Sequence, residues 1–181
     1  MKEKWLANDF FRQDVLIVAP ALIGKKLVRS WPGGETRAYL ITETEAYRGQ
    51  EDRACHASRG KTPRTGIMYE PGGVLYMYLI YGMYWMLNVV TSVKDDPQAV
   101  LIRGLREVSG PGRLTRQLEL DGSFNGEELV KSERLGIMDA GIQPSYTTHP
   151  RIGIDYAGEP WNTKPWRFLM NGDGTARVTA P

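Results

Sequence analysis

Two strand-like aromatic runs separated by a two-residue break constrain the fold of this chain more than any other feature. Residues 74–81 and 84–93 are rich in aromatic and β-branched side chains, and Gly82 and Met83 lie between them. Runs of this kind joined by so short a connection are typical of a β-hairpin. We therefore predict an antiparallel hairpin that carries Tyr81, Gly82 and Met83 at or near its tip.

Apolar spacing and turn residues predict the remaining elements. Strands are expected at residues 26–30, 36–47, 99–105, 151–154 and 166–170, and helices at residues 10–22, 113–120 and 126–135. Asn8 or Asp9 is the candidate N-cap of the first helix, and Gly24 follows its end. Residues 49–66 are polar, basic and turn-rich, which indicates an ordered loop outside the core. Strands outnumber helices and adjacent strands are linked as hairpins, so we predict an α+β fold: a single domain with a mostly antiparallel sheet and a few helices.

Composition and charge limit the classes of protein to which the chain can belong. Its 181 residues fit one domain, and 41% hydrophobic with 24% charged residues is ordinary for a soluble globular protein. A formal net charge of +2 excludes a histone-like binder but not a DNA enzyme, because the position of the charges decides phosphate contact. The single cysteine, Cys55, cannot form an intramolecular disulfide, which indicates a reducing compartment.

The sequence also predicts the location of the protein in the cell and the absence of a metal or other cofactor. No apolar run is long enough to cross a bilayer, and the N-terminus lacks the apolar core of a signal peptide. We therefore predict an intracellular protein, in the cytoplasm or nucleoid if its source is prokaryotic, with no membrane association. Two histidines and one cysteine are too few for a convincing zinc site, so neither a metal nor another cofactor is expected.

Two glutamates fall on one face of the strand predicted at residues 36–47. Side chains alternate along a strand, so Glu43 and Glu45 share a face with Tyr39, Ile41 and Tyr47. A carboxylate buried on such a face needs a partner or a purpose, and burial among aromatic rings raises a carboxyl pKa toward the range that suits a general base. The alternative is a strand end that emerges into solvent with both glutamates hydrated.

The hairpin itself suggests contact with nucleic acid. Tyr76 and Tyr78 point the same way on its first strand, and Tyr81 and Met83 lie at its tip. An aromatic-rich hairpin is usually core packing, which is the alternative here. Exposed apolar side chains at a tip, however, match the wedges that proteins insert between base steps.

Basic side chains gather in two places, one in the loop after Glu45 and one around a glycine-rich turn at residues 110–112. The members are Arg53, Arg59, Lys61 and Arg64 in the first cluster, and Arg103, Arg106, Arg113 and Arg116 in the second. Glycine-rich turns and helix starts bind phosphate through backbone N–H groups, so phosphate contacts are predicted here, with a solvated basic surface as the alternative. His56 lies in the first cluster and is either a catalytic or a satisfied structural histidine.

Taken in order, these segments resemble the 3-methyladenine (alkyladenine) DNA glycosylase family. The resemblance runs from about residue 22 to residue 169. The segments that carry it are 43–47 (ETEAY), Glu51-Asp52 through Ala54 to His56, 62–64 (TPR), 76–84 (YMYLIYGMY), Asn88, 99–103 (AVLIR), 109–114 (SGPGRL) and 151–154 (RIGI).

The resemblance implies a catalytic pair and a pocket for the damaged base. Glu45 corresponds to the general base that activates a water, and Arg103 to the arginine that helps to hold this water. The implied pocket residues are Tyr47 and Tyr78, which sandwich the flipped base, His56 beside Tyr47, Asn88, which crowds the 2-amino group of normal guanine, and Leu101.

The resemblance also implies how the protein contacts DNA. Tyr81 fills the gap left by the flipped nucleotide, and Met83 belongs to the same intercalating tip. The implied DNA-backbone contacts are Arg59, Arg64, Gly110, Gly112 and Arg113.

Fold and function follow from the resemblance as expectations. They are a curved, mostly antiparallel sheet with a protruding hairpin, and a monofunctional base-excision-repair glycosylase. Such an enzyme flips alkylated or deaminated purines from double-stranded DNA and hydrolyses the N-glycosidic bond, which leaves an abasic site; a monomer is expected. Two alternatives are a non-catalytic DNA-bending module and a small-molecule hydrolase or transferase that uses the paired glutamates.

Overall fold

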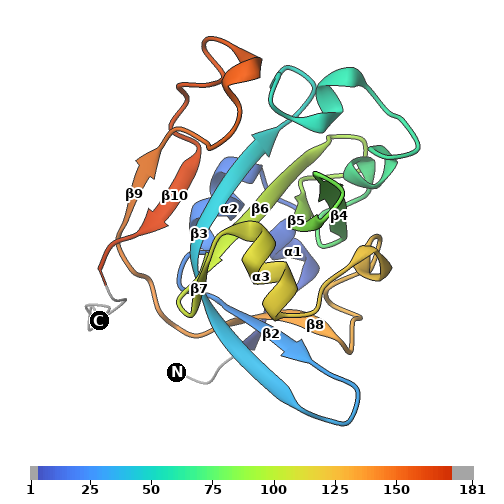
Figure 1. The fold of residues 1–181 in the computed structure, drawn as a ribbon, viewed down its shortest axis with the longest axis vertical. Helices are drawn as coiled ribbons and strands as arrows, with labels where there is room; N and C mark the ends of the chain where they lie inside the picture. Colours follow the sequence, from blue (N-terminus) through green and yellow to red (C-terminus); the bar gives the residue numbers. More distant parts are fainter. Residues whose placement is uncertain (1–3, 173–181) are drawn as a thin grey trace.

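The computed structural model describes residues 4–172, which contain three α-helices and ten strands (Figure 1). The strands are β1 (Lys4–Trp5), β2 (Lys26–Ser30), β3 (Thr36–Arg48), β4 (Leu75–Ile80), β5 (Tyr84–Thr91), β6 (Gln98–Leu105), β7 (Val108–Ser109), β8 (Leu135–Asp139), β9 (Tyr146–His149) and β10 (Arg167–Met170). The α-helices are α1 (Asn8–Phe11), α2 (Val15–Ala21) and α3 (Pro111–Gln117). Strands β2 to β6 and β10 confirm the predicted positions to within a residue or two.

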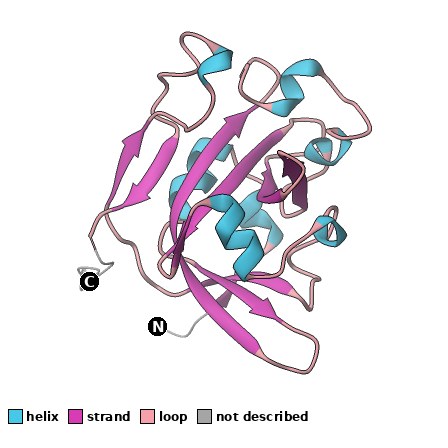
Figure 2. Ribbon diagram, viewed as in Figure 1, coloured by secondary structure: helices cyan, strands magenta, loops and turns pink. Residues whose placement is uncertain are grey.

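All ten strands join one sheet (Figure 2). The main path has the order β1-β8-β2-β3-β6-β5-β4, while β10 pairs with β3 and β9, and β7 pairs with β6. Every one of these pairings is antiparallel, which confirms the predicted mostly antiparallel sheet with a few helices.

Strand β3 lies inside the sheet and pairs with three other strands. One edge pairs with β6, and the other pairs first with β2 and then with β10. Two adjacent irregularities interrupt the β3–β6 ladder, where the partners are Ile41–Leu105, Glu43–Gly104 and Thr44–Ile102. This register leaves one extra residue in each strand, Thr42 in β3 and Arg103 in β6. Bulges of this kind bend a strand and re-aim side chains.

The bulge also changes which side chains of β3 share a face, compared with the prediction from strict alternation. Tyr39, Leu40 and Ile41 are consecutive, and all of them belong to the main hydrophobic core. The prediction that Tyr39 and Ile41 share a face with the two glutamates is therefore wrong, because the extra residue breaks the alternation between Ile41 and Glu43.

Helices cover both faces of the sheet around β3 and β6 (Figure 1). Helix α2 lies behind β3, and Thr44 Oγ1 donates to the carbonyl of Ala19 at 2.8 Å. Helix α3 lies in front, and Thr115 Oγ1 donates to the carbonyl of Trp85 at 2.8 Å. No helix within residues 4–172 is long and apolar enough to cross a membrane.

The helix predicted at residues 10–22 is divided into α1 and α2. The N–H of Ser92 donates to the carbonyls of Phe11 and Gln13 at 3.0 and 2.9 Å, which takes these carbonyls out of a continuous helix. Asp14 then caps α2 with its side chain. The apolar spacing continues across the break because both helices pack on the same core, so the pattern did not show the interruption.

Two further helix predictions need correction. Residues 126–135 form turns rather than a helix, because backbone groups of Glu127 and Leu129 bond to Leu75 and Gly73 beside β4 at 2.9 Å. The helix predicted at residues 113–120 is α3, which begins earlier, with Pro111 in its first turn.

The strand predicted at residues 151–154 is also wrong. β9, which was not predicted, is the partner of β10, and the chain then turns inward at Arg151, whose side chain is buried. Gly153 has a φ of 74°, which is incompatible with a regular strand.

The loop at residues 49–66 is confirmed as a loop, with one short 3-10 helix, η1 (His56–Arg59). Its predicted place outside the core is wrong, because Asp52, Ala54, Cys55 and Ala57 are all buried. Small side chains and a paired acid let a polar segment pack inside.

Candidate active site

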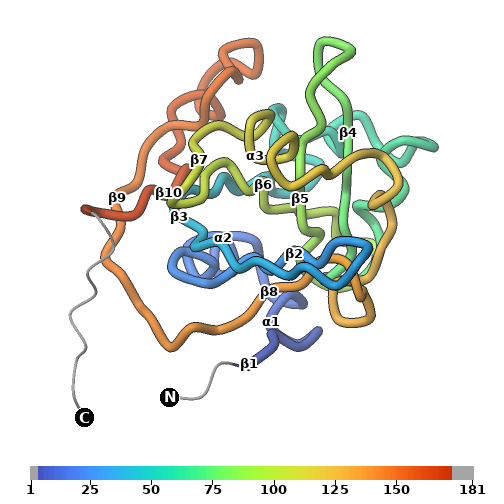
Figure 3. Tube along the Cα trace, turned by 60° about the horizontal axis from the view of Figure 1, so that its bottom comes forward, coloured from blue at the N-terminus to red at the C-terminus, as the bar shows by residue number. Residues whose placement is uncertain are grey.

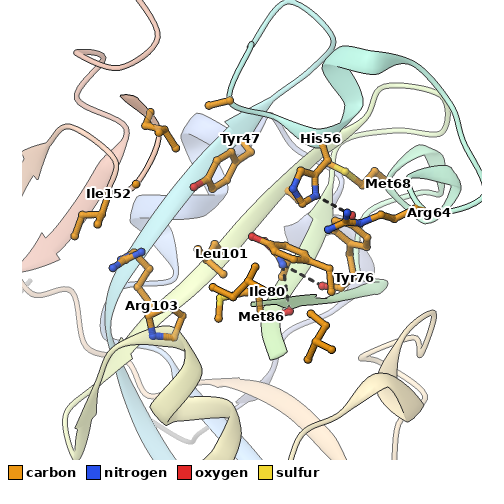
Figure 4. A pocket seen from close by; sticks show the side chains of 18 of the residues that line it. Tyr47, His56, Arg64, Met68, Tyr76, Ile80, Met86, Leu101, Arg103 and Ile152 are labelled. Carbon is orange, nitrogen blue, oxygen red and sulfur yellow. Dashed lines mark hydrogen bonds between the residues drawn. The ribbon is translucent and has the colours of Figure 1, made fainter. Parts of the chain in front are cut away.

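A cavity of about 610 Å³ opens between the sheet, the loop after β3 and the segment after β9. Figure 4 shows Tyr47 projecting from β3, His56 from the loop and Ile152 from the segment after β9, with Arg103 at the lower edge. Eight residues predicted from the sequence line it: Tyr47, His56, Arg64, Tyr78, Tyr81, Asn88, Leu101 and Arg103. The structure thus brings together segments that are far apart in the chain.

Glu45 lies beneath this cavity rather than on its surface, with 0% of its area exposed. Its Oε2 accepts a hydrogen bond from the Tyr47 hydroxyl at 2.7 Å, and its Oε1 accepts one from the backbone N–H of Ile152 at 2.8 Å. Burial raises the pKa of Glu45, and the charge of Arg103 together with these hydrogen bonds opposes the rise. The carboxyl group is therefore fixed in place and has a raised proton affinity.

Arg103 links the two glutamates of β3. Its Nη1 lies 3.5 Å from Glu45 Oε1, and its Nε donates to Glu43 Oε1 at 3.3 Å. Arg167 of β10 also donates to Glu43 Oε1, at 3.0 Å. Because Arg103 is the extra residue of β6, the bulge turns its guanidinium toward the carboxylates. Two arginines thus balance two carboxylates, and Arg103 alone of these four side chains lines the cavity.

Tyr47 and Tyr78 supply aromatic walls from strands that are not neighbours, since β6 and β5 lie between β3 and β4. Burial raises the pKa of both phenols, and the negative charge of Glu45 adds to the rise. Both hydroxyls are therefore protonated at neutral pH, which lets Tyr47 donate to Glu45.

His56 packs edge-on against Tyr78, with ring centroids 4.6 Å apart. Its Nδ1 lies 2.9 Å from the hydroxyl of Tyr76. Burial, together with the positive charges of Arg64 and Arg59, lowers the pKa of His56 to about 4. His56 is therefore neutral at neutral pH, which makes it a hydrogen-bonding wall rather than an acid.

Asn88 and Leu101 lie opposite each other on β5 and β6, and both line the cavity. Asn88 Nδ2 donates to the carbonyls of Tyr76 and Met86 at 3.1 and 3.4 Å. These bonds fix the amide, so the side chain forms a rigid part of the cavity wall.

Tyr81 and Met83 lie at the tip of the β4–β5 hairpin, as predicted, and are 85% and 65% exposed. Three residues, Tyr81 to Met83, connect Ile80 to its partner Tyr84, and the N–H of Met83 donates to the carbonyl of Ile80 at 3.1 Å. Tyr81 and Gly82, the central residues of this turn, both have positive φ, 51° and 67°, as in a type I′ turn. Figure 3 shows this hairpin and the loop after β9 projecting on the same side of the molecule. Tyr81 and Tyr156 from these two projections both line the cavity.

Seven of the eight residues in the predicted basic clusters are exposed, and the exception is Arg103. Arg59, Arg64 and Arg113 are exposed, whereas Arg103 is engaged with the glutamates. Gly112 packs against the ring of Tyr84, and a Cβ there would lie 2.9 Å from it, so this glycine has a packing role beside the hairpin. Gly110 precedes α3 with a φ of 98°.

The sequence did not assign a role to several cavity residues. Ile152 belongs to a quoted motif, but only the fold shows its N–H bonded to Glu45. Met86 and Tyr156 also line the cavity, and an exposed tyrosine in a loop has no pattern that would single it out. Within residues 4–172, no group of three or more His, Cys, Asp or Glu side chains is placed to hold a metal ion.

Comparison with known proteins places the chain in a family. The model of the family described as Methylpurine-DNA glycosylase (MPG) matches residues 9–109 and 106–174. A protein of Rickettsia rickettsii (strain Sheila Smith) is 42% identical over 172 residues, which cover 91% of this chain and 89% of the relative. A protein of Anaeromyxobacter dehalogenans (strain 2CP-C) is 42% identical over 97% of this chain and 88% of its own length. Both carry the name "Putative 3-methyladenine DNA glycosylase".

Proposed function

Because the chain belongs to the methylpurine-DNA glycosylase (MPG) family, a family of hydrolases that remove alkylated bases from DNA, we propose that it flips the damaged purine into the cavity and cuts the N-glycosidic bond there. The observation that carries this proposal is Glu45, a buried carboxyl group with a raised pKa directly beneath an aromatic cavity.

The flipped purine would lie between Tyr47 and Tyr78. A cavity of about 610 Å³ is large enough for a purine, and its aromatic faces attract the positive charge of an alkylated base. Asn88, held by its two backbone carbonyls, would exclude the 2-amino group of normal guanine, and Leu101 would pack beside it.

Glu45 would act as general base on a water held beside Arg103. The water oxygen bonds to C1′ of the sugar, its proton passes to Glu45, and the electron pair of the C1′–N bond leaves with the purine. Positive charge develops on the sugar in such reactions, and a carboxylate stabilises it. Glu45 is covered in the free protein, so the water would enter at the edge formed by Arg103 and Ile152, which line the cavity.

The cavity favours leaving groups that already carry positive charge. Burial raises the pKa of Tyr47 and Tyr78 and lowers that of His56, to about 4, so none of these walls donates a proton readily at neutral pH. Alkylated purines need no such proton, whereas hypoxanthine leaves well only when protonated. The enzyme would release both alkylated purines and hypoxanthine, and it would release the alkylated purines faster.

The reaction would end at an abasic site. A lyase step needs an amine nucleophile, and no lysine of the described chain lines the cavity. A monofunctional glycosylase is therefore proposed. One chain supplies every residue that lines the cavity, so the enzyme is proposed to act as a monomer.

The exposed hairpin tip would engage the duplex. Tyr81 would occupy the gap left by the flipped nucleotide, with Met83 beside it. Arg59, Arg64, Gly110, Gly112 and Arg113 are the proposed contacts to the DNA backbone.

The experiment is release of free purine from methylated duplex DNA and from hypoxanthine-containing duplex, by the wild type and by Glu45→Gln. The wild type is expected to release both, methylated purine first, and Glu45→Gln to lose about 10²- to 10⁴-fold in rate while still binding abasic-site DNA. Full excision by Glu45→Gln would overturn the assignment of the base. Turnover of small molecules without DNA, or DNA bending with no base release, would favour the two alternative functions.

A further inference from the structure

Asp52 and Arg151 are ninety-nine residues apart in sequence and meet beneath the cavity. Arg151 Nη1 donates to Asp52 Oδ2 at 2.6 Å, and its Nη2 donates to Asp52 Oδ1 at 2.9 Å. Both side chains are completely buried. Neither has a part in the chemistry described above, although both lie in segments that carry the resemblance to the glycosylase family.

The pair is bonded at two points to the backbone of β3. Arg151 Nη1 also donates to the carbonyl of Ala46 at 2.9 Å, the residue between Glu45 and Tyr47. Asp52 accepts from the N–H of Arg48 at 3.0 Å. The ion pair therefore fixes the end of β3, which carries the proposed base, Glu45, and the proposed stacking ring, Tyr47.

The guanidinium of Arg151 also supports the ring of Tyr47. Its Cζ lies 4.7 Å from the ring centroid. Tyr47 lines the cavity and Arg151 does not, so the arginine covers the face of the ring that is turned away from the cavity. The Cζ of Arg151 also lies over the ring of Trp166, 5.1 Å from its centroid.

The residue after Arg151 completes the arrangement. Ile152 donates its backbone N–H to Glu45 Oε1 at 2.8 Å. A buried arginine with fixed partners determines where its own backbone lies, and hence where the next N–H points.

We propose that Arg151, fixed by Asp52, is a positioning residue for excision: it holds the ring of Tyr47 and the N–H of Ile152 against Glu45. The proposal rests on the function proposed above. A buried ion pair adds little net stability compared with an apolar replacement, because desolvation of the charges offsets their attraction. The pair contacts the backbone of β3 and the ring of Tyr47 and directly precedes the N–H of Ile152, so its role is to position these groups rather than to add stability.

The variants are Arg151→Lys, which keeps the charge but not the two-pronged geometry, and Asp52→Asn, which keeps the shape. Arg134→Met is the matched control, because Arg134 pairs with Glu127, covers the ring of Phe124 at 3.9 Å and does not line the cavity. Each protein is assayed for thermal stability, affinity for lesion-containing duplex, and single-turnover excision rate across pH.

Arg151→Lys and Asp52→Asn are expected to excise roughly 10- to 100-fold more slowly at saturating enzyme, with a smaller change in affinity. The acid limb of the pH–rate profile should move to higher pH, because a weaker hydrogen bond from the Ile152 N–H raises the pKa of Glu45. Arg151→Lys keeps the charges near that carboxyl, those of Glu43, Arg103 and residue 151, so the shift of the acid limb is measured in this variant. Asp52→Asn also removes a negative charge, so it is judged by its rate.

A wild-type rate in both folded variants, together with a wild-type acid limb in Arg151→Lys, would overturn the proposal. So would a rate loss in Arg134→Met equal to theirs at matched stability, since the effect would then be one of folding. Failure of the wild type to release any purine would instead contradict the proposed function itself.

Discussion

The Tyr47 hydroxyl donates a 2.7 Å hydrogen bond to Oε2 of Glu45, two residues away on the same strand. The ring proposed to stack on the base and the carboxyl proposed to activate the water are therefore one unit. A substitution of either residue should therefore alter the position or the pKa of the other.

Tyr47→Phe tests this coupling, because it keeps the ring and removes the donor. The lost hydrogen bond favoured ionised Glu45, so its pKa should rise and the acid limb of excision should move to higher pH. A hydrogen bond to a charged group is worth about 1.5–3 kcal/mol, so a clear shift is expected in single-turnover rates across pH. Tyr69→Phe is the control, since Tyr69 is also buried and hydrogen-bonded, to Gln50, but does not line the cavity. An unmoved limb in Tyr47→Phe would show that the bond does not tune Glu45.

Glu45→Gln should raise stability at neutral pH while it slows excision by about 10²- to 10⁴-fold. The pKa of Glu45 is raised on folding, so the folded protein binds this proton more tightly than the unfolded chain. Stability from this group is present below the unfolded pKa, near 4, and is lost as pH rises through the folded value. Denaturant titrations of both proteins at pH 4 and pH 7 should therefore diverge only at pH 7. A glutamine variant that is less stable at pH 7 would contradict the sign.

Tyr81→Ser should weaken excision from duplex DNA more than from flexible single-stranded DNA. The wedge offsets unstacking, which costs a few kcal/mol in a duplex and less in a single strand. Tyr146→Ser is a suitable control, since Tyr146 is exposed on β9 and does not line the cavity. An equal loss on both substrates would argue against a wedge. Tyr81→Gly, which suits the φ of 51°, separates loss of the ring from strain in the turn.

Asn88→Gly should increase release of normal guanine. Removal of a rigid pocket side chain changes discrimination by about 1–3 kcal/mol, or roughly 10- to 200-fold. Guanine release from undamaged DNA, relative to methylpurine release, measures it. Because glycine weakens a strand, Asn88→Ala is assayed beside it, and Asn125→Ala serves as the control, as Asn125 bonds to Met77 of the same hairpin outside the cavity. Unchanged discrimination in both Asn88 variants would remove this role.

The sequence predicted the central strands well because their alternation and turns are local properties. The hairpin tip is an example, where Gly82 supplies one of the two positive φ values and Tyr81 accepts the other. The same local patterns missed β8 and β9, which are short strands set by their partners β2 and β10 rather than by their own alternation.

The sequence predicted many of the residues that line the cavity but not the geometry of the candidate site. Glu45 and Tyr47 follow from spacing and resemblance, and the cavity does contain the predicted walls. The Ile152 N–H and the buried Asp52–Arg151 pair could not be inferred, because each joins segments about one hundred residues apart in sequence. Pairings of that kind depend on tertiary packing, which no local pattern encodes.

The extra residues Thr42 and Arg103 have a consequence for how such a chain can change over time. They offset each other, so the β3–β6 register is the same on both sides of the irregular stretch. Deletion of either one alone would slide half of the ladder by a residue and turn its side chains to the opposite face. Deletion of both would restore the register but leave no arginine opposite the glutamates. At this point in the sheet, chain length is therefore under tighter constraint than the identity of most side chains, and insertions or deletions should be tolerated far less than substitutions.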